Sequence, residues 1–406
     1  MKKNCTLLLP RPVFPVVSGY SHKNYNLIQI LSGQYKLHIV VISQDVLADE
    51  EIAFYHTCGA ECTVHRMAKG KSYIQTILGL LSSRPLQVSY YYDSALQPVV
   101  NSLAAESDVI IAALVRTREY VERAVEVLEK KEPHVEQGKP VVVFDMVDSI
   151  ALNYGRSRSK TKSLFWKLIY SIEGSRLMKY EQHSIERSSI TYLFNQEEQT
   201  YWKRYGNVQW LPHGVEAKLL TYAKREEAWS GQVAFIGKMN YQPNVDAILW
   251  YMKHVHVHIG HRVPLIIVGA YPTKEIEELA ASLGHVTVTG FVDDPYIYIN
   301  SAMAVIAPMQ TGGGIQNKVL EGMALGKVNI VSSLAAGPII GAVDGKHLLV
   351  ADRPEDMERL ILELAEDQHR YDEIGKHAKE LIEKTFSWVA YGEGYVSGIE
   401  KDMREI

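Results

Sequence analysis

The chain has 406 residues, of which 47% are hydrophobic and 22% charged, and 43 basic against 47 acidic residues leave a formal net charge of −4. At roughly 150 residues per domain, this length predicts two or three domains. The composition excludes a collagen, a disulfide scaffold and a disordered chain, and the near-neutral charge argues against a dedicated nucleic-acid binder, whose domain would be clearly basic.

The cysteines and the apolar runs indicate in which compartment of the cell the protein is expected. Three cysteines, Cys5, Cys58 and Cys62, do not make a disulfide framework. The first apolar run ends at Pro10 and is therefore too short for a signal peptide. No apolar run approaches the roughly 18 residues of a membrane span. We therefore expect a cytoplasmic protein, with peripheral contact to the inner membrane face left open.

The first half of the chain predicts strands alternating with helices. Strands are expected at residues 5–9, 37–43, 108–115, 140–144 and 192–194, and helices at residues 24–31 and 119–131. Because these strands are mostly unbroken apolar runs, the pattern is typical of a parallel sheet covered on both faces.

After a junction near residues 210–216, a second alternating set begins. Strands are expected at residues 232–236, 264–268, 286–289, 304–308, 328–332 and 345–350, and helices at residues 244–253, 275–283, 317–325 and 354–366. The sequence thus predicts an α/β protein of two Rossmann-like doubly wound domains that face a central cleft. Residues 1–213 with 389–406 would form the first domain and residues 214–388 the second.

The most informative motif is TGGGIQNKVLEGMALG, residues 311–326. A glycine loop before a helix frees backbone N–H groups for a phosphate, and the helix dipole favours negative charge there. Lys318 would add a cation for a diphosphate. Glu321, one turn later, could accept two sugar hydroxyls. The alternative is a plain glycine turn with a solvated Lys–Glu pair.

Four segments in order resemble the donor-binding domain of the retaining GT-B glycosyltransferases of family four, the glycosyl transferases group 1. They are residues 235–250, 265–272, 286–294 and 305–327. The resemblance implies a GT-B fold, in which the second domain binds a nucleotide-sugar and the first an acceptor. Phe386-Ser387-Trp388 resembles the family's kink, after which the last helix crosses back to the first domain.

The resemblance also implies site residues. Lys238 and Lys318 would neutralise the leaving diphosphate, and Glu321 would hold the ribose. The other donor-binding positions would be Gly237, Gly290, Phe291, Val292, Gly312, Gly313, Gly314, Ile315, Gln316 and Asn317. The sequence departs from the family at Gly313, where a glutamate usually stands, and at His213 in residues 211–216, where a hinge role is expected.

The acceptor side is predicted in the first domain. Ser18, Gly19 and Tyr20 follow the first strand, where the family has a loop that faces phosphate and acceptor; a simple Pro/Gly turn is the alternative. Asp145 and Asp148 end a buried strand, and Asp148 is the first candidate for a catalytic group beside the acceptor hydroxyl. The alternative for this segment is a helix N-cap.

Two basic stretches predict contact with an anionic membrane surface. Residues 155–180 contain seven cations and one acid, interleaved with apolar residues: Arg156, Arg158, Lys160, Lys162, Lys167, Arg176 and Lys179 against Glu173. Residues 66–84 combine Lys69 and Lys71 with several isoleucines and leucines. Such segments can lie on an anionic leaflet. A solvated face and a core-facing stripe are the alternatives.

The resemblance therefore implies a retaining, nucleotide-sugar-dependent hexosyl- or related glycosyltransferase of bacterial-type polysaccharide or glycolipid synthesis. Its partners would be a nucleotide-sugar and a glycan or glycolipid, with no cofactor, metal or nucleic acid. A nucleotide-sugar 2-epimerase of the same fold would need several acid/base groups around the sugar, and the sequence offers no such cluster. A non-catalytic nucleotide-sugar-binding partner is the third hypothesis, favoured only by Gly313.

Overall fold

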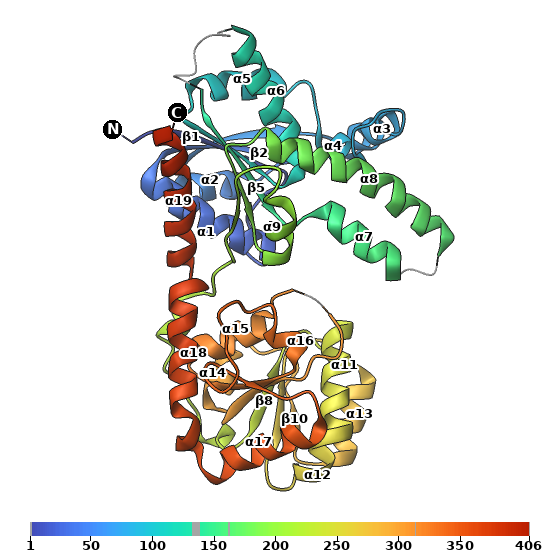
Figure 1. Cartoon of the computed structure of the whole chain (residues 1–406), viewed down its shortest axis with the longest axis vertical. Helices are drawn as coiled ribbons and strands as arrows, with labels where there is room; N and C mark the ends of the chain where they lie inside the picture. The colour runs from blue at the N-terminus through green and yellow to red at the C-terminus, as the bar shows by residue number, and fades with distance from the viewer. Residues whose placement is uncertain (1, 132–138, 161–162, 313, 406) are drawn as a thin grey trace. The chain divides into compact units, whose positions relative to one another are not determined.

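The computed structural model describes residues 2–131, 139–160, 163–312 and 314–405 (Figure 1). The chain divides into two compact units, Met1–Pro212 with Gly392–Ile406, and His213–Tyr391. The sequence-based division has its junctions at 213/214 and 388/389, whereas the structure has them at 212/213 and 391/392. The second junction lies inside one continuous helix, α19 (Trp388–Glu405).

The first unit is a seven-stranded parallel sheet with helices around it. Its strands are β1 (Asn4–Leu9), β2 (Lys36–Ser43), β3 (Ala60–Arg66), β4 (Val109–Ala113), β5 (Val141–Val147), β6 (Ile190–Leu193) and β7 (Val208–Trp210). Its helices are α1 (Gly19–Gln34), α2 (Asp49–Thr57), α3 (Lys69–Leu80), α4 (Leu86–Tyr91), α5 (Gln97–Glu106), α6 (Val115–Lys131), α7 (Ile150–Lys160), α8 (Leu164–Glu186) and α9 (Gln196–Trp202), with most of α19. The strand order is β3-β2-β1-β4-β5-β6-β7.

The second unit repeats this plan with six parallel strands in the order β10-β9-β8-β11-β12-β13. The strands are β8 (Val233–Ile236), β9 (Leu265–Val268), β10 (Val286–Val288), β11 (Ala304–Ala307), β12 (Val328–Val331) and β13 (Leu349–Val350). The α-helices are α10 (Ala217–Leu220), α11 (Gln242–Tyr251), α12 (Val257–Ile259), α13 (Lys274–Leu283), α14 (Tyr296–Ser301), α15 (Asn317–Ala324), α16 (Ser333–Ala336), α17 (Pro354–Glu366) and α18 (Asp372–Thr385). Shorter turns of other helix types are η1 (Glu227–Trp229), η2 (Met252–His256) and η3 (Gln368–Tyr371).

The unbroken apolar runs of the sequence form the buried strands of both sheets. The residues of β4, β8, β9, β11 and β12 are buried throughout, because helices cover both faces of a doubly wound sheet. Both sheets start at a central strand and wind outward in two directions, so the prediction of two Rossmann-like α/β units is confirmed.

Several predicted elements need correction. The first helix begins at Gly19, well before residue 24, because Ser18 caps it by accepting a hydrogen bond from the Ser21 amide (3.2 Å). Strand β3 escaped prediction because it is an edge strand with mostly half-buried side chains. The strand expected at 345–350 shrinks to two residues. The basic stretch 155–180 falls on two helices, α7 and α8, and Lys162 lies outside the described residues.

Candidate active site

The sheet order of the second unit defines one switch point, between β8 and β11. In open parallel sheets, ligands bind beyond the carboxyl ends of the strands at such a point. Two connections leave the sheet there, one from β8 through Gly237 and Lys238 into α11, and one from β11 through residues 308–316 into α15. The topology thus brings together the two loops that the sequence singled out.

Two glycines allow the loops after β8 and β9 to pack closely. Gly269 has φ +146°, and a Cβ there would lie 1.8 Å from the Gly237 carbonyl oxygen. Gly237 has φ +155°, and a Cβ there would lie 2.5 Å from Asn244 Nδ2. L residues rarely adopt such backbone angles, and no side chain fits these spaces. The edge of the site is therefore built from backbone.

Asn244, in the first turn of α11, connects the two loops. Its Nδ2 donates to the Lys238 carbonyl (3.0 Å), and its Oδ1 accepts from Lys318 Nζ (2.7 Å). The side chain is buried, so both hydrogen bonds are shielded from water. Asn244 fixes the loop after β8 and the Lys318 ammonium relative to each other.

Lys318 is a buried cation, with only 8% of its surface exposed. Its ammonium lies 3.5 Å from Met309 Sδ and 5.2 Å from the centre of the Phe235 ring. Burial lowers the pKa of Lys318 to about 8, and the nearby Glu321 carboxylate opposes this shift. A desolvated ammonium with one neutral hydrogen-bond acceptor at 2.7 Å is poised to meet an anion.

The start of α15 is open to a ligand. Its N-cap is Gln316, whose side chain makes no capping hydrogen bond, and no acidic residue stands in the first turn. Gly312 and Gly314 precede it with φ values of +110° and +74°. The helix therefore presents unsatisfied N–H groups and the positive end of its dipole at the switch point. Gly313 lies outside the described residues.

Glu321 lies one turn further along α15 and is half-buried. Burial raises its pKa to about 7; the hydrogen bond from the Tyr296 hydroxyl opposes this shift, and Glu216 adds to it. Tyr296 comes from α14, so the carboxylate is held from a second element. Lys318 and Glu321 share one helical face, as their spacing predicted.

The remaining donor-side candidates lie in loops or at the start of a helix, and several of them are exposed. Lys238 follows β8 and is exposed. After β10 the chain turns at Gly290, with φ +67°, and leaves the Phe291 side chain largely in solvent and Val292 half-buried. Ile315 and Gln316 are half-buried, and Asn317 is exposed. These residues all follow the carboxyl ends of neighbouring strands of one sheet.

Residues 213–215 pack against the segment that leads into α19 and against the first residue of that helix. A Cβ on Gly214 would lie 2.3 Å from the Trp388 amide nitrogen, and the Val215 amide donates to the Phe386 carbonyl (2.7 Å). The two segments that the sequence marked as junction and kink therefore lie side by side in the second unit. His213 is half-buried beside them.

In the first unit, the loop after β1 ends in a helix cap. Ser18 and Ser21 form a capping box at the start of α1, so the Ser18 hydroxyl is already bonded. Gly19 is the first residue of the helix. The Tyr20 hydroxyl donates to the Arg11 carbonyl (2.8 Å), and the Arg11 guanidinium lies 4.1 Å from the ring centre.

Asp145 has to be withdrawn as a residue in direct contact with an acceptor. It is fully buried in β5 and pairs with Lys23 of α1. A carboxylate with no exposed surface cannot touch an acceptor hydroxyl in this conformation. Asp148 is exposed and stays a candidate; desolvation raises its pKa, and Arg156 opposes that shift. The N-cap alternative applies to Ser149, whose hydroxyl accepts from the Leu152 amide (3.2 Å).

Sequence reasoning missed Asn244, Tyr296 and Lys23. Asn244 lies in a quoted segment, but its partner is 74 residues away in sequence, so no spacing links them. Lys23 resembles any surface lysine of an amphipathic helix, and only the fold places it against β5. Among the described residues, no group of three or more histidine, cysteine or acidic side chains could hold a metal ion.

The chain is similar to known proteins in sequence and in fold. Residues 230–367 match the model of the family described as Glycosyl transferases group 1. An uncharacterized glycosyltransferase of Methanocaldococcus jannaschii, MJ1069, is 22% identical over 270 residues, which are 64% of this chain and 65% of that protein. O-antigen chain mannosyltransferase B of Escherichia coli is 26% identical over 215 residues, 50% of this chain and 55% of that one. The alignments span less than two thirds of either relative.

The fold has solved counterparts. Alr3699/HepE from Anabaena, crystallised with UDP, is similar over 98% of this chain and 100% of its own, with a TM-score of 0.64 and 13% identity. At this identity the likeness concerns the fold alone. Within the described ranges, no helix is both long and apolar enough to cross a bilayer. By sequence, residues 230–367 of the second unit are similar to the glycosyl transferases group 1, and by fold the whole chain is similar to two-domain proteins of the GT-B type.

Proposed function

We propose that this chain is a retaining glycosyltransferase that moves a sugar from a nucleotide-sugar to a hydroxyl acceptor. One observation carries the proposal: Lys318 is buried at the open start of α15, where Asn244 holds its ammonium toward the loops at the switch point. A cation beside unsatisfied N–H groups and a helix dipole favours a diphosphate. The same groups stabilise the charge that develops when that diphosphate leaves.

Each part of the nucleotide-sugar has candidate contact residues in the second unit. Lys318, Lys238 and the amides around Gly312 and Gly314 would take the diphosphate, and Glu321 would accept the ribose hydroxyls. Residues 290–292 would frame the nucleobase through their backbone. The carboxylate that the family places by the sugar is replaced by Gly313. Backbone amides or another residue would therefore contact the transferred sugar.

Relatives support a nucleotide-sugar donor. Alr3699/HepE is known in complexes with UDP, with UDP and glucose, and with UDP-glucose. One sequence relative is a mannosyltransferase of the O-antigen chain. From these relatives we infer a hexose-type donor and a glycan or glycolipid acceptor of bacterial-type surface polysaccharide synthesis. We place the protein in the cytoplasm, peripheral to the inner membrane face.

The chemistry follows from the charges. In retention without a protein nucleophile, the acceptor hydroxyl attacks from the face that the diphosphate leaves, and a phosphate oxygen takes its proton. Such a step needs stabilisation of the leaving group more than a strong base. Asp148, exposed at the end of β5, is the candidate that would orient the acceptor. We assign no metal or cofactor to the reaction.

The proposal is tested in two steps. Thermal unfolding of the full chain is followed with UDP-, GDP- and ADP-sugars, because a ligand that binds only the folded state raises its stability by mass action. The selected donor is then incubated with and without glycan acceptors. We expect transfer that needs an acceptor and keeps the anomeric configuration. Conversion of the donor alone to its 2-epimer, or binding without any turnover, would overturn the assignment.

Lys318→Ala should bind the donor more weakly and lower kcat by about 10²- to 10³-fold, the usual loss when one donor to a developing oxyanion is removed. Lys253→Ala is the matched control, since Lys253 is an exposed lysine of η2 in the same unit. Activity of the control should stay close to that of the wild type.

A further inference from the structure

Helix α3 has the reverse of the usual burial pattern. Its apolar side chains Tyr73, Ile74, Ile77, Leu78 and Leu80, and Leu81 just after it, are 55–90% exposed. Its buried residues are Ser72 and Gly79. A surface helix normally turns its apolar stripe toward the core and its polar face to water. Tyr73 of this face meets the Tyr90 ring edge-on, with ring centres 5.8 Å apart, but most of the face is exposed, and such a patch marks an interaction surface.

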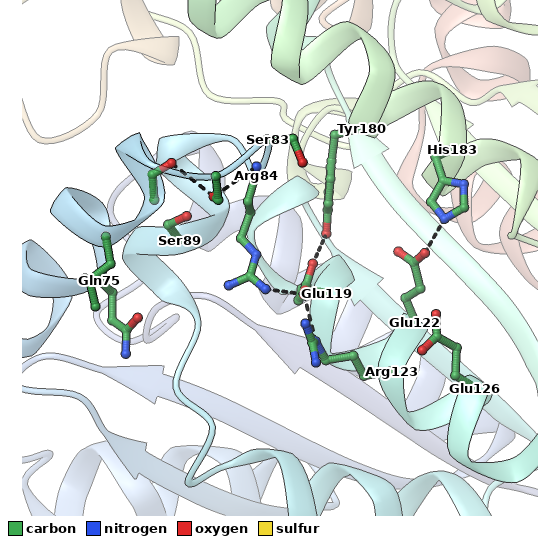
Figure 2. A pocket seen from close by; sticks show the side chains of 13 residues that line it. Gln75, Ser83, Arg84, Ser89, Glu119, Glu122, Arg123, Glu126, Tyr180 and His183 are labelled. Atoms are coloured by element: carbon green, nitrogen blue, oxygen red, sulfur yellow. Dashed lines mark hydrogen bonds and ion pairs between the residues drawn. The ribbon is translucent and has the colours of Figure 1, made fainter. Parts of the chain in front are cut away.

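Polar contacts hold this helix in place. Leu80 accepts from Arg176 of α8 at its carbonyl (3.0 Å), Lys71 pairs with Asp93 (2.7 Å), and the following turn is anchored where Arg84 pairs with Glu119 (2.8 Å). Behind α3, between α6 and α8, lies a polar pocket of about 500 Å³ (Figure 2). Figure 2 shows Arg84 meeting Glu119 in this pocket. Polar contacts therefore help to attach α3, while most of its apolar side chains stay exposed.

The start of α8 extends the same kind of surface. Trp166, Leu168 and Ile172 are about half exposed or more, and Trp166 stacks on Tyr170 with ring centres 5.8 Å apart. The bond from Arg176 to the Leu80 carbonyl joins α8 to the end of α3. In Figure 1, α3, α7 and α8 lie on the same side of the first unit. Nine of the 19 large hydrophobic side chains exposed in the described chain belong to these two stretches.

The two stretches that carry these apolar side chains are rich in cations. Residues 66–84 contain no acid, and Arg66 and Lys69 there are exposed. Near α8, Arg158 and Lys179 are exposed. The only acid of residues 155–180, Glu173, is buried and already bonded to Arg176 (3.0 Å) and to the Leu86 amide (2.8 Å). A second copy of this face would repel the first. An anionic lipid surface matches both the charge and the apolar side chains.

We propose that the apolar face of α3 and the start of α8 dock together on an anionic lipid bilayer, with their aliphatic and aromatic side chains at headgroup depth. This deepens the peripheral location proposed above by naming the surface and the lipid charge. Docking is measured without donor or acceptor, so its failure would leave the donor assignment intact, and failure of donor binding would leave the docking intact.

The test is flotation of the full chain with vesicles of phosphatidylcholine, with or without phosphatidylglycerol. We expect the protein to float with the anionic vesicles and to be released by high salt, because surface charge attraction is screened. Ile77→Glu with Leu81→Glu should lower the bound fraction at least tenfold. Val46→Glu is the matched control, since Val46 is equally exposed in the same unit but outside this surface, and it should bind as the wild type does.

Lys69→Glu tests the contribution of charge separately, because Lys69 is polar and exposed. This variant should weaken binding to anionic vesicles only. Three results would overturn the proposal. The first is wild-type protein that does not float with anionic vesicles, and the second is a double variant that floats as the wild type does. The third is a wild-type dimer in sedimentation velocity that the double substitution dissociates into monomers. The last would assign the face to a second copy of this chain.

Discussion

Replacing Lys318 by methionine should separate function from stability. Burial lowers the pKa of Lys318 from 10.5 to about 8. At 1.36 kcal/mol per pKa unit, keeping this ammonium charged in the folded state costs about 3 kcal/mol at neutral pH. Methionine keeps much of the apolar stem and removes the charge. Against this gain, the Asn244 carbonyl loses its donor, which costs about 2 kcal/mol. We expect a net gain of about 1 kcal/mol.

The pH dependence gives the sign of the effect. Because the folded-state pKa lies below the unfolded one, the unfolded chain binds more protons between pH 8 and 10.5, and the wild type gains stability as pH rises through this window. Below pH 8 the burial cost is present in full. The advantage of Lys318→Met should therefore be largest at neutral pH and turn into a net loss as the pH approaches 10.5, where only the cost at Asn244 remains.

Two assays read this prediction. Thermal unfolding at pH 7 should show a Tm about 2–4 °C higher than the wild type, the shift expected of 1 kcal/mol in a unit of this size. Turnover with the donor and acceptor should fall by about 10²- to 10³-fold. Lys253→Met, at an exposed lysine, should change neither. A clear fall in the Tm of Lys318→Met, or wild-type turnover, would refute the reasoning.

Three further predictions concern other parts of the chain. The pH profile of kcat/KM for the donor should be bell-shaped with limbs near pH 7 and 8, because Glu321 must be ionised and Lys318 protonated; a flat profile from pH 6 to 9 would contradict these roles. Gly269→Ala should destabilise the second unit by more than 3 kcal/mol in chemical denaturation, since its Cβ would meet the Gly237 carbonyl at 1.8 Å. Asp145→Asn should cost about 3–5 kcal/mol of stability because it leaves the buried lysine of α1 unpaired, and an unchanged denaturation midpoint would rule out this pairing.

The sequence predicted the parts of the candidate site that depend on local spacing. Lys318 and Glu321 stand three residues apart in one helix, and glycines precede that helix, so both the shared face and the open start could be read from the chain. The buried strand runs located most of both sheets. The alternation of strands and helices predicted parallel sheets, but the strand order that defines the switch point is known only from the structure.

Contacts between distant segments were beyond this reasoning. Asn244 holds Lys318 across 74 residues, and an asparagine in the first turn of a helix has many ordinary explanations. Asp145 follows an apolar run and looked accessible, but its side chain turns inward to Lys23 on α1. The exposed apolar face of α3 was open to the core-facing alternative, because periodicity shows that a helix has two faces without showing which one is buried.

The continuous helix α19 determines when, during synthesis of the chain, the first unit can finish folding. Its residues from Gly392 onward belong to the first unit. There the Tyr192 hydroxyl donates to the Tyr395 carbonyl (2.8 Å), the two rings stack with centres 4.4 Å apart, and Asn207 bonds Asp402 (3.3 Å). These residues leave the ribosome only after the entire second unit. The first unit therefore cannot complete its fold during its own translation, and it must wait, with Tyr192 uncovered, for the second to be made.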